Sequence, residues 1–171
     1  MIADLRGALH EAMANYDFVE AMLHSIGRFG EYRDTMPFAA GAYTRTRLQR
    51  NAEFEIVAML WAPGSRSPIH DHGDSRCWVV VLDGNLDVEN FERLNDGTDA
   101  VADLRSFAPS RLTLGAIDRR SGPKELHRVS NSFERAAYSL QLYAAPLGAY
   151  TVVDDRGLTS LSLAQADAGL I

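Results

Sequence analysis

Apolar residues recur at intervals of three and four positions along the first thirty residues, which is the spacing of one face of an α-helix. These positions are Leu5, Ala8, Ala12, Tyr16, Val19 and Leu23. Gly27 and Gly30 then interrupt the pattern. The spacing predicts a helical N-terminal segment over about residues 1–35 that packs its apolar face on the rest of the chain.

Short apolar or alternating runs replace the helical spacing in the remainder of the chain. They predict strands over residues 53–61, 77–82, 86–92, 111–114, 136–143 and 150–153. Asp83-Gly84-Asn85 predicts a hairpin turn between the second and third of these strands. Many short strands after a helical start predict a mainly β fold, a small β-barrel or jelly roll, formed as one domain over residues 1–171.

Composition and charge narrow the classes of partner. The chain has 171 residues, 46% of them hydrophobic, and a formal net charge of -6, with no basic run that would favour nucleic-acid binding. Its one cysteine, Cys77, excludes an intrachain disulfide and suits a reducing cytoplasm. No apolar stretch is long enough to span a bilayer, and the N-terminus lacks the order of a signal peptide. We expect a cytoplasmic monomer or small homo-oligomer without membrane or nucleic-acid partners.

Two histidines one residue apart, His70 and His72, are the strongest chemical signal in the chain. Residues i and i+2 of an extended strand point to the same face, so both imidazoles can bind one transition metal. His127 supplies a third nitrogen donor, and three donors leave coordination positions open for a substrate. The alternative is a histidine pair in the core or on the surface that binds no metal, and zinc is not excluded by the residues alone.

The lack of a carboxylate beside these histidines has a physical consequence. A divalent ion held by three neutral imidazoles keeps its full charge and favours an anionic ligand from the substrate. A thiolate, which is both anionic and soft, fits this requirement.

The spacing of these residues resembles the two motifs of the cupin superfamily. Gly64, His70 and His72 match the first motif, in which Cys77 stands where a glutamate is usual and Gly84 at the expected glycine. Pro123, His127 and Asn131 match the second motif. Two motifs in the right order are more specific than either motif alone.

Five segments, together spanning about residues 40–155, resemble the cysteine dioxygenase family in their order and spacing. They are Tyr43-Thr44-Arg45, the run from Ser67 to Cys77, Gly84-Asn85-Leu86, Leu126-His127-Arg128-Val129 and Ser139-Leu140-Gln141-Leu142-Tyr143. The resemblance implies Fe(2+) bound by His70, His72 and His127. It also implies that Arg45 holds the substrate carboxylate, as a guanidinium fork can do, with Tyr43 beside it in the pocket.

The same resemblance assigns Tyr143 as the active-site tyrosine and Cys77 as its possible thioether partner. A strict count of alternating positions puts Cys77 on the opposite face from His72, but the turn-like residues 73–75 between them can reset the register. Without the resemblance, Cys77 would be interpreted as a small buried core residue.

Departures from the family pattern concern the surroundings of Tyr143. The usual relay of serine, histidine and tyrosine is here Ser139, Gln141 and Tyr143, and glutamine carries no proton charge near neutral pH. Alanines replace the serine and first proline after the tyrosine, so a cis-proline turn is not expected there. A cysteine that the family often has near the pocket is replaced here, at about Tyr150, by a bulkier residue.

We therefore expect an iron(II) thiol dioxygenase that adds both atoms of O2 to the sulfur of a small carboxylated thiol, with L-cysteine as the first choice. Another thiol such as 3-mercaptopropionate is the nearest alternative. A non-oxidative cupin, either a metal-dependent isomerase or a small-molecule sensor using zinc, nickel or manganese, is the alternative from another functional class.

Overall fold

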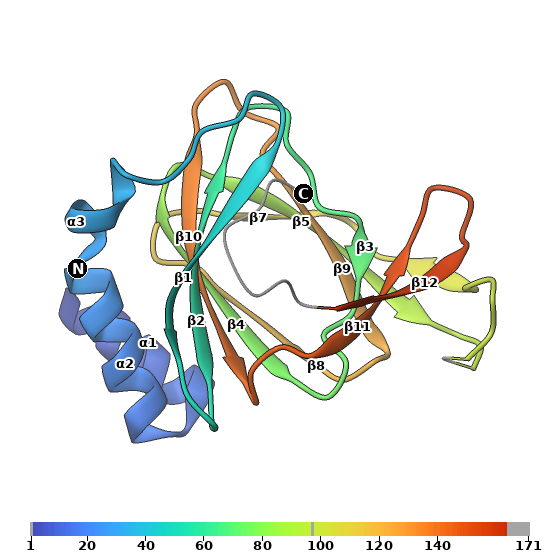
Figure 1. Ribbon diagram of the computed structural model, residues 1–171, viewed down its shortest axis with the longest axis horizontal. Coiled ribbons are helices and arrows are strands. Elements are labelled where there is room, and N and C mark those ends of the chain that lie inside the picture. The colour runs from blue at the N-terminus through green and yellow to red at the C-terminus, as the bar shows by residue number, and fades with distance from the viewer. Residues whose placement is uncertain (1, 97, 164–171) are drawn as a thin grey trace.

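The computed structural model describes residues 2–96 and 98–163, and it is mainly β with helices at the N-terminus (Figure 1). The predicted helical segment is confirmed as three helices, α1 (Ile2–Met13), α2 (Tyr16–Gly27) and α3 (Phe29–Arg33). Asn15 separates the first two helices because its side chain accepts a hydrogen bond from the Phe18 amide and caps α2.

Two antiparallel sheets form the body of the molecule. The five-stranded sheet has the order β1 (Tyr43–Arg50), β2 (Glu55–Trp61), β10 (Ala137–Ala144), β4 (Arg76–Asp83) and β8 (Ile117–Ser121). The other sheet has the order β12 (Thr159–Leu163), β11 (Ala149–Val153), β3 (Ile69–His70), β9 (Glu125–Ser130), β5 (Leu86–Arg93) and β6 (Leu104–Ser106), and β7 (Ser110–Leu112) also pairs with β5.

The five-stranded sheet is covered on both faces. One face carries Leu140, Leu142 and Trp78, which pack against buried side chains of α1 and α2. Trp78 Nε1 also donates a hydrogen bond of 3.0 Å to the Ala12 carbonyl at the end of α1. The other face carries alternate residues of the same strands and packs against β5, β7 and β9. The helices therefore lie outside the barrel, and the inner face of this sheet is turned toward the other sheet.

Most predicted strands are present, but one predicted connection is wrong. The strand predicted over 86–92 corresponds to β5, yet β5 pairs with β6, β7 and β9 and belongs to the sheet opposite β4. The turn at Asp83-Gly84-Asn85 is therefore a crossover between sheets, and the predicted hairpin does not form. Local turn residues favour a tight reversal, but they do not determine which sheet receives the next strand.

Strands β1, β8 and β9 were not predicted because charged residues interrupt their apolar pattern. The Ala144–Ala145 peptide bond is cis, although no proline follows it at position 145. The single domain over residues 1–171 stays a prediction, and its residues 164–171 lie outside the described residues. Within the described residues, no helix has the length and apolar character needed to span a bilayer.

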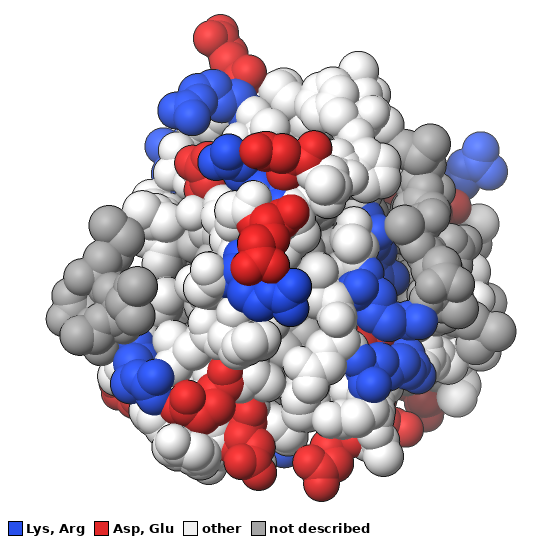
Figure 2. Space-filling view, turned by 60° about the vertical axis from the view of Figure 1, so that its left-hand side comes forward, with Lys and Arg blue, Asp and Glu red and all other residues white. Residues whose placement is uncertain are grey.

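Acidic and basic side chains lie close together over the face of the molecule shown in Figure 2. Exposed ion pairs such as Arg6–Glu20 and Arg28–Glu31 fit this mixed surface. Pairs of this kind contribute little to stability, so the packing between the sheets and under the helices is the main source of stability.

The crossover at Gly84 generates a prediction about stability. Gly84 has a φ of +73°, and a Cβ there would lie 2.9 Å from the Ala136 carbonyl oxygen and from Ala137 Cα. We expect Gly84→Ala to lower the free energy of unfolding by about 2 to 4 kcal/mol, because left-handed strain and overpacking add. The control is Gly115→Ala, which has φ +78° and nothing within 4 Å, and should cost only about 1 kcal/mol. Equal losses in urea unfolding would show that the close approach at Gly84 has no effect.

Candidate metal centre

The structure brings the three predicted histidines to one point between the sheets. His70 of β3 lies directly opposite His127 of β9 in the strand register, although 57 residues separate them in the chain. Ring centroids are 4.7 Å apart for His70 and His127, 4.9 Å for His72 and His127, and 5.2 Å for His70 and His72. One nitrogen from each ring lies within 4.8 Å of the other two. The predicted convergence of three imidazoles is confirmed as geometry.

A tied-down turn presents His70 and His72 from one segment. Strand β3 ends at His70, so His72 lies beyond the strand rather than inside it. The buried Asp71 carboxylate between them accepts hydrogen bonds of 2.9 Å from the amides of Gly73 and Thr151. These two bonds fix the turn against β11 and hold both imidazoles on the inner side.

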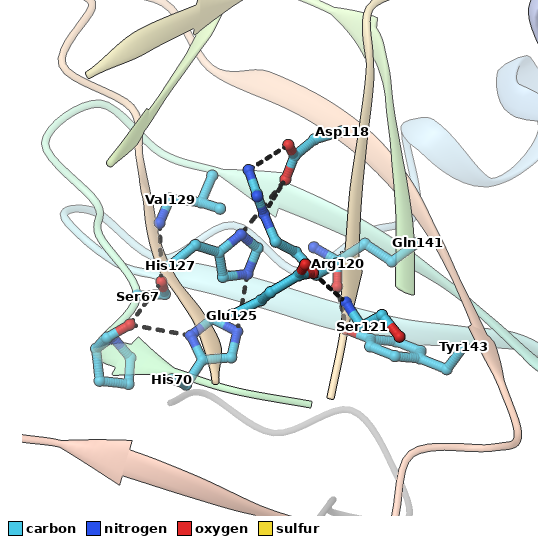
Figure 3. Close-up of polar contacts among 11 residues, drawn as sticks. Ser67, His70, Asp118, Arg120, Ser121, Glu125, His127, Val129, Gln141 and Tyr143 are labelled. Atoms are coloured by element: carbon cyan, nitrogen blue, oxygen red, sulfur yellow. Dashed lines mark hydrogen bonds and ion pairs between the residues drawn. The ribbon is translucent and has the colours of Figure 1, made fainter. Parts of the chain in front are cut away.

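The nitrogens of the three rings are arranged for metal binding. His70 Nδ1 lies 3.0 Å from the Pro68 carbonyl oxygen (Figure 3). This acceptor places the ring proton on Nδ1, so the lone pair of Nε2 is available to a metal ion. His70 Nε2 faces His127 Nε2 at 3.3 Å. Two nitrogens bound at about 2.1 Å to one tetrahedral or octahedral ion lie roughly 3.0 to 3.4 Å apart. The observed separation fits a shared metal ion.

Burial keeps these histidines neutral. Desolvation lowers the pKa of His70, and it lowers the pKa of His72 and His127 well below the ordinary value, with the neighbouring imidazoles and Arg120 adding to the effect. A neutral imidazole has a free lone pair, which a metal ligand requires. His72 Nδ1 and His127 Nδ1 are also buried without a hydrogen-bond partner among the described residues.

A cavity of about 30 Å³ lies beside His70, and the residues predicted to bind substrate are part of its lining. Its walls include Tyr43, Arg45, Gln141, Tyr143 and Tyr150. Tyr150 lines this cavity, and its ring centroid lies 6.0 Å from that of His70. Burial raises the pKa of Tyr43 to about 12, so its phenol stays protonated.

Cys77 and Tyr143 lie side by side on adjacent strands. They are direct partners in the register of β4 and β10, and both are buried. Burial raises the pKa of both groups. The turn around Gly73 has therefore brought Cys77 to the inner face, as the turn-like residues 73–75 allowed. The thioether between Cys77 and Tyr143 stays a prediction.

The Ser139, Gln141 and Tyr143 side chains share the inner face of β10, but they do not form one chain of hydrogen bonds. The Tyr143 hydroxyl donates to Gln141 Oε1, whereas Ser139 Oγ accepts a bond of 3.0 Å from Trp61 Nε1. Within residues 2–96 and 98–163, no hydrogen bond joins Gln141 to Ser139. Gln141 orients the tyrosine, and Ser139 orients a tryptophan of the cavity wall.

Two charged residues inside the barrel, Asp118 and Arg120 of β8, were not among the candidates expected from the sequence. Their ion pair is largely buried, and Asp118 Oδ2 lies 3.5 Å from His127 Nδ1. The available signal was their separation by two positions, which puts both side chains on one face of a strand. Charged residues in a short unpredicted strand are more often exposed, so this signal was weak.

Comparison with known proteins agrees with the geometry of the site. A model of the family described as cysteine dioxygenase type I matches residues 1–156. The chain belongs to this family. Cysteine dioxygenase type 1 of Rattus norvegicus is 31% identical over 162 residues, covering 91% of this chain and 80% of the relative. The Homo sapiens protein is 28% identical over 171 residues with the same coverage.

Solved structures confirm the cupin fold that was expected for this cysteine dioxygenase family member. The protein TT1209 from Thermus thermophilus superposes with a TM-score of 0.53 at 15% identity, covering 67% of this chain and 93% of that chain. Oxalate oxidase in complex with the substrate analogue glycolate superposes with a TM-score of 0.52 at 19% identity, covering 67% and 57%. At these identities the likeness concerns the fold alone.

The lowered pKa values of the histidines predict a pH-dependent stability of the metal-free protein. In the unfolded chain the histidines become protonated near pH 6.5, whereas in the folded protein they stay neutral. The free energy of unfolding should therefore fall as the pH drops below about 6.5. Each histidine contributes up to about 1.4 kcal/mol per pH unit. Urea unfolding with a chelator between about pH 7 and pH 5 measures this slope.

His72→Gln should make that slope shallower, since it removes one of the three buried imidazoles. The exposed His24 provides the control, and His24→Gln should leave the slope unchanged. Identical slopes in the wild-type protein and His72→Gln would contradict the buried, neutral state of His72.

Proposed function

We propose that this protein is an iron(II)-dependent thiol dioxygenase that converts L-cysteine to cysteine sulfinate. The observation that carries the proposal is that a group of metal-binding side chains and a cationic side chain lie at the same cavity. Three neutral imidazoles converge at one end of a small cavity, and the guanidinium of Arg45 lines the same cavity. The first feature is suited to a metal that binds sulfur, and the second to a carboxylate.

Arg45 has the surroundings of an anion-binding residue. Its side chain is half-buried in strand β1, and among the described residues it has neither a hydrogen bond nor an ion pair. A cation removed from water without a counterion costs free energy, so the site favours an anionic guest. A substrate carboxylate can accept two parallel hydrogen bonds from the guanidinium fork.

The donor set of the site fits iron. His70, His72 and His127 would hold the ion, which supplies the activation of O2 for transfer of both oxygen atoms to sulfur. The separation between His70 Nε2 and His127 Nε2 and the convergence of one nitrogen from each of the three rings support a resident metal. The set contains no carboxylate, so an anionic thiolate is the ligand that best offsets the charge of the ion.

Tyr143 positions the reacting groups by hydrogen bonding. Burial raises its pKa, so the phenol stays protonated, and its hydroxyl is oriented by donating to Gln141 Oε1. The phenol oxygen remains free to accept a hydrogen bond from a substrate group in the cavity. Gln141 cannot take up the proton, so we infer that it orients Tyr143 without relaying charge.

The apolar walls of the cavity limit both water and substrate size. Met59, Trp61, Val129 and Leu147 line it together with Tyr150. Exclusion of water strengthens the interaction between Arg45 and a carboxylate. Because the bulky Tyr150 lines the cavity beside His70, a smaller carboxylated thiol such as 3-mercaptopropionate is the second candidate substrate. We also infer a cytoplasmic location, because a chain with a single cysteine suits a reducing compartment.

The test is anaerobic loading with iron(II), followed by oxygen uptake and product mass with a panel of thiols. We expect one O2 consumed per thiol and a product heavier by two oxygen atoms, with the highest kcat/KM for L-cysteine. A much higher kcat/KM for 3-mercaptopropionate would change the substrate assignment. Stoichiometric zinc in protein purified without added metal, with no oxygen uptake after iron loading, would favour a non-oxidative cupin.

Arg45→Ala tests how the substrate is bound. Loss of charge-assisted hydrogen bonds worth about 1.5 to 3 kcal/mol should raise the KM for L-cysteine by about 10- to 100-fold. Iron content should not change, because Arg45 is not a candidate ligand. Cysteamine, which lacks the carboxylate, serves as the matched substrate and should show similar kcat/KM in both proteins. An unchanged KM for L-cysteine would remove Arg45 from the binding site.

A further inference from the structure

The ion pair between Asp118 and Arg120 lies within the barrel and has no part in the chemistry described so far. Arg120 Nε lies 3.0 Å from Asp118 Oδ2, and Arg120 Nη2 lies 2.5 Å from Oδ1. The Arg120 side chain is only 17% exposed and the Asp118 side chain only 13%. A buried pair of this kind can often be replaced by apolar residues without loss of stability. Stability alone therefore does not account for it.

The position of the pair points to the metal centre. Strand β8 pairs with β4 so that Asp118 lies opposite Val79 and Arg120 lies opposite Cys77, both residues of the inner core. Figure 3 shows dashed contacts that run from the Asp118 carboxylate to both the guanidinium of Arg120 and the ring of His127. Asp118 Oδ2 lies 3.5 Å from His127 Nδ1, a nitrogen that is buried and has no hydrogen-bond partner among the described residues.

We propose that Asp118 is a positioning residue for the metal centre. Its carboxylate accepts a hydrogen bond from Nδ1–H of His127, and Arg120 holds that carboxylate in place. The inference rests on the proposed binding of a metal by the three histidines. A proton on Nδ1 leaves Nε2 as the metal donor, and Nε2 is the nitrogen that faces His70. The 3.5 Å separation must shorten by about half an ångström to become a hydrogen bond.

This arrangement would make His127 different from His70 as a ligand. The Nδ1 of His70 faces the neutral carbonyl of Pro68, whereas the Nδ1 of His127 faces a carboxylate. A carboxylate partner raises the basicity of an imidazole ligand more than a neutral carbonyl does. Asp118 would thus supply, through His127, part of the negative charge that a set of three imidazoles lacks.

Two variants separate this role from a purely structural one. Asp118→Asn keeps the size of the side chain and an acceptor oxygen but removes the charge. The double variant Asp118→Leu/Arg120→Met removes the acceptor and both charges, so no buried charge is left unpaired. Dissociation constants for iron(II) and cobalt(II), the visible spectrum of the cobalt-loaded protein, and the melting temperature are measured for each.

We expect affinity for both metals to fall by about 10-fold in Asp118→Asn and by about 100-fold in the double variant. The cobalt bands should shift in both, because the ligand field of His127 changes. The melting temperature of the metal-free double variant should stay close to that of the wild-type protein. Asp34→Asn is the matched control, because Asp34 forms an exposed ion pair with Arg33, and it should leave affinity and spectrum unchanged.

Wild-type affinity and an unshifted cobalt spectrum in the double variant would overturn the inference. Recovery of affinity in the double variant after loss in Asp118→Asn would also overturn it, because an unpaired Arg120 would then explain the loss. A wild-type protein that binds cobalt tightly but oxidises no thiol after loading with iron(II) would contradict the proposed function and leave this inference intact.

Discussion

One pairing between two strands, His70 opposite His127, is the constraint on which the site depends. It sets two imidazoles from distant parts of the chain face to face, and His72 completes the group from the same turn as His70. Strand β3 is only two residues long, so its position relies on its neighbours β9 and β11 and on the hydrogen bonds of Asp71. A shift of one residue in this register would turn His127 to the opposite face of the sheet.

The electrostatics of the interior follow from the same enclosure. Burial removes the charge of the histidines by lowering their pKa, while the guanidinium of Arg45 keeps its charge. Arg120 has its counterion in Asp118, but Arg45 has no ion-pair partner in the part of the chain that the structure describes. The interior is therefore short of negative charge on the side of the cavity, where an anionic substrate is expected to bind.

The sequence was informative where chemistry depends on a few residues at fixed spacing. His70 and His72 could be found from their spacing and His127 from its motif. The resemblance to a family pointed to Arg45, Cys77 and Tyr143, whose roles stay predictions although the structure places all three near the histidines. The crossover after Asp83 could not be identified, because the same turn residues suit a hairpin. Asp118 and Arg120 were missed because nothing local distinguishes a charged strand that faces inward from one that faces solvent. Their burial depends on the pairing of β8 with β4, which is a long-range property.

Strand β10 serves two purposes through alternate positions. Leu140 and Leu142 pack under the helices, while Ser139, Gln141 and Tyr143 face the interior of the barrel. The two sets of positions contact different parts of the molecule. Exchanges on the inner set would change the lining of the interior, and exchanges on the outer set would change the packing of the helices. An insertion of a single residue is the change that this strand tolerates least, because both sets would be exchanged at once.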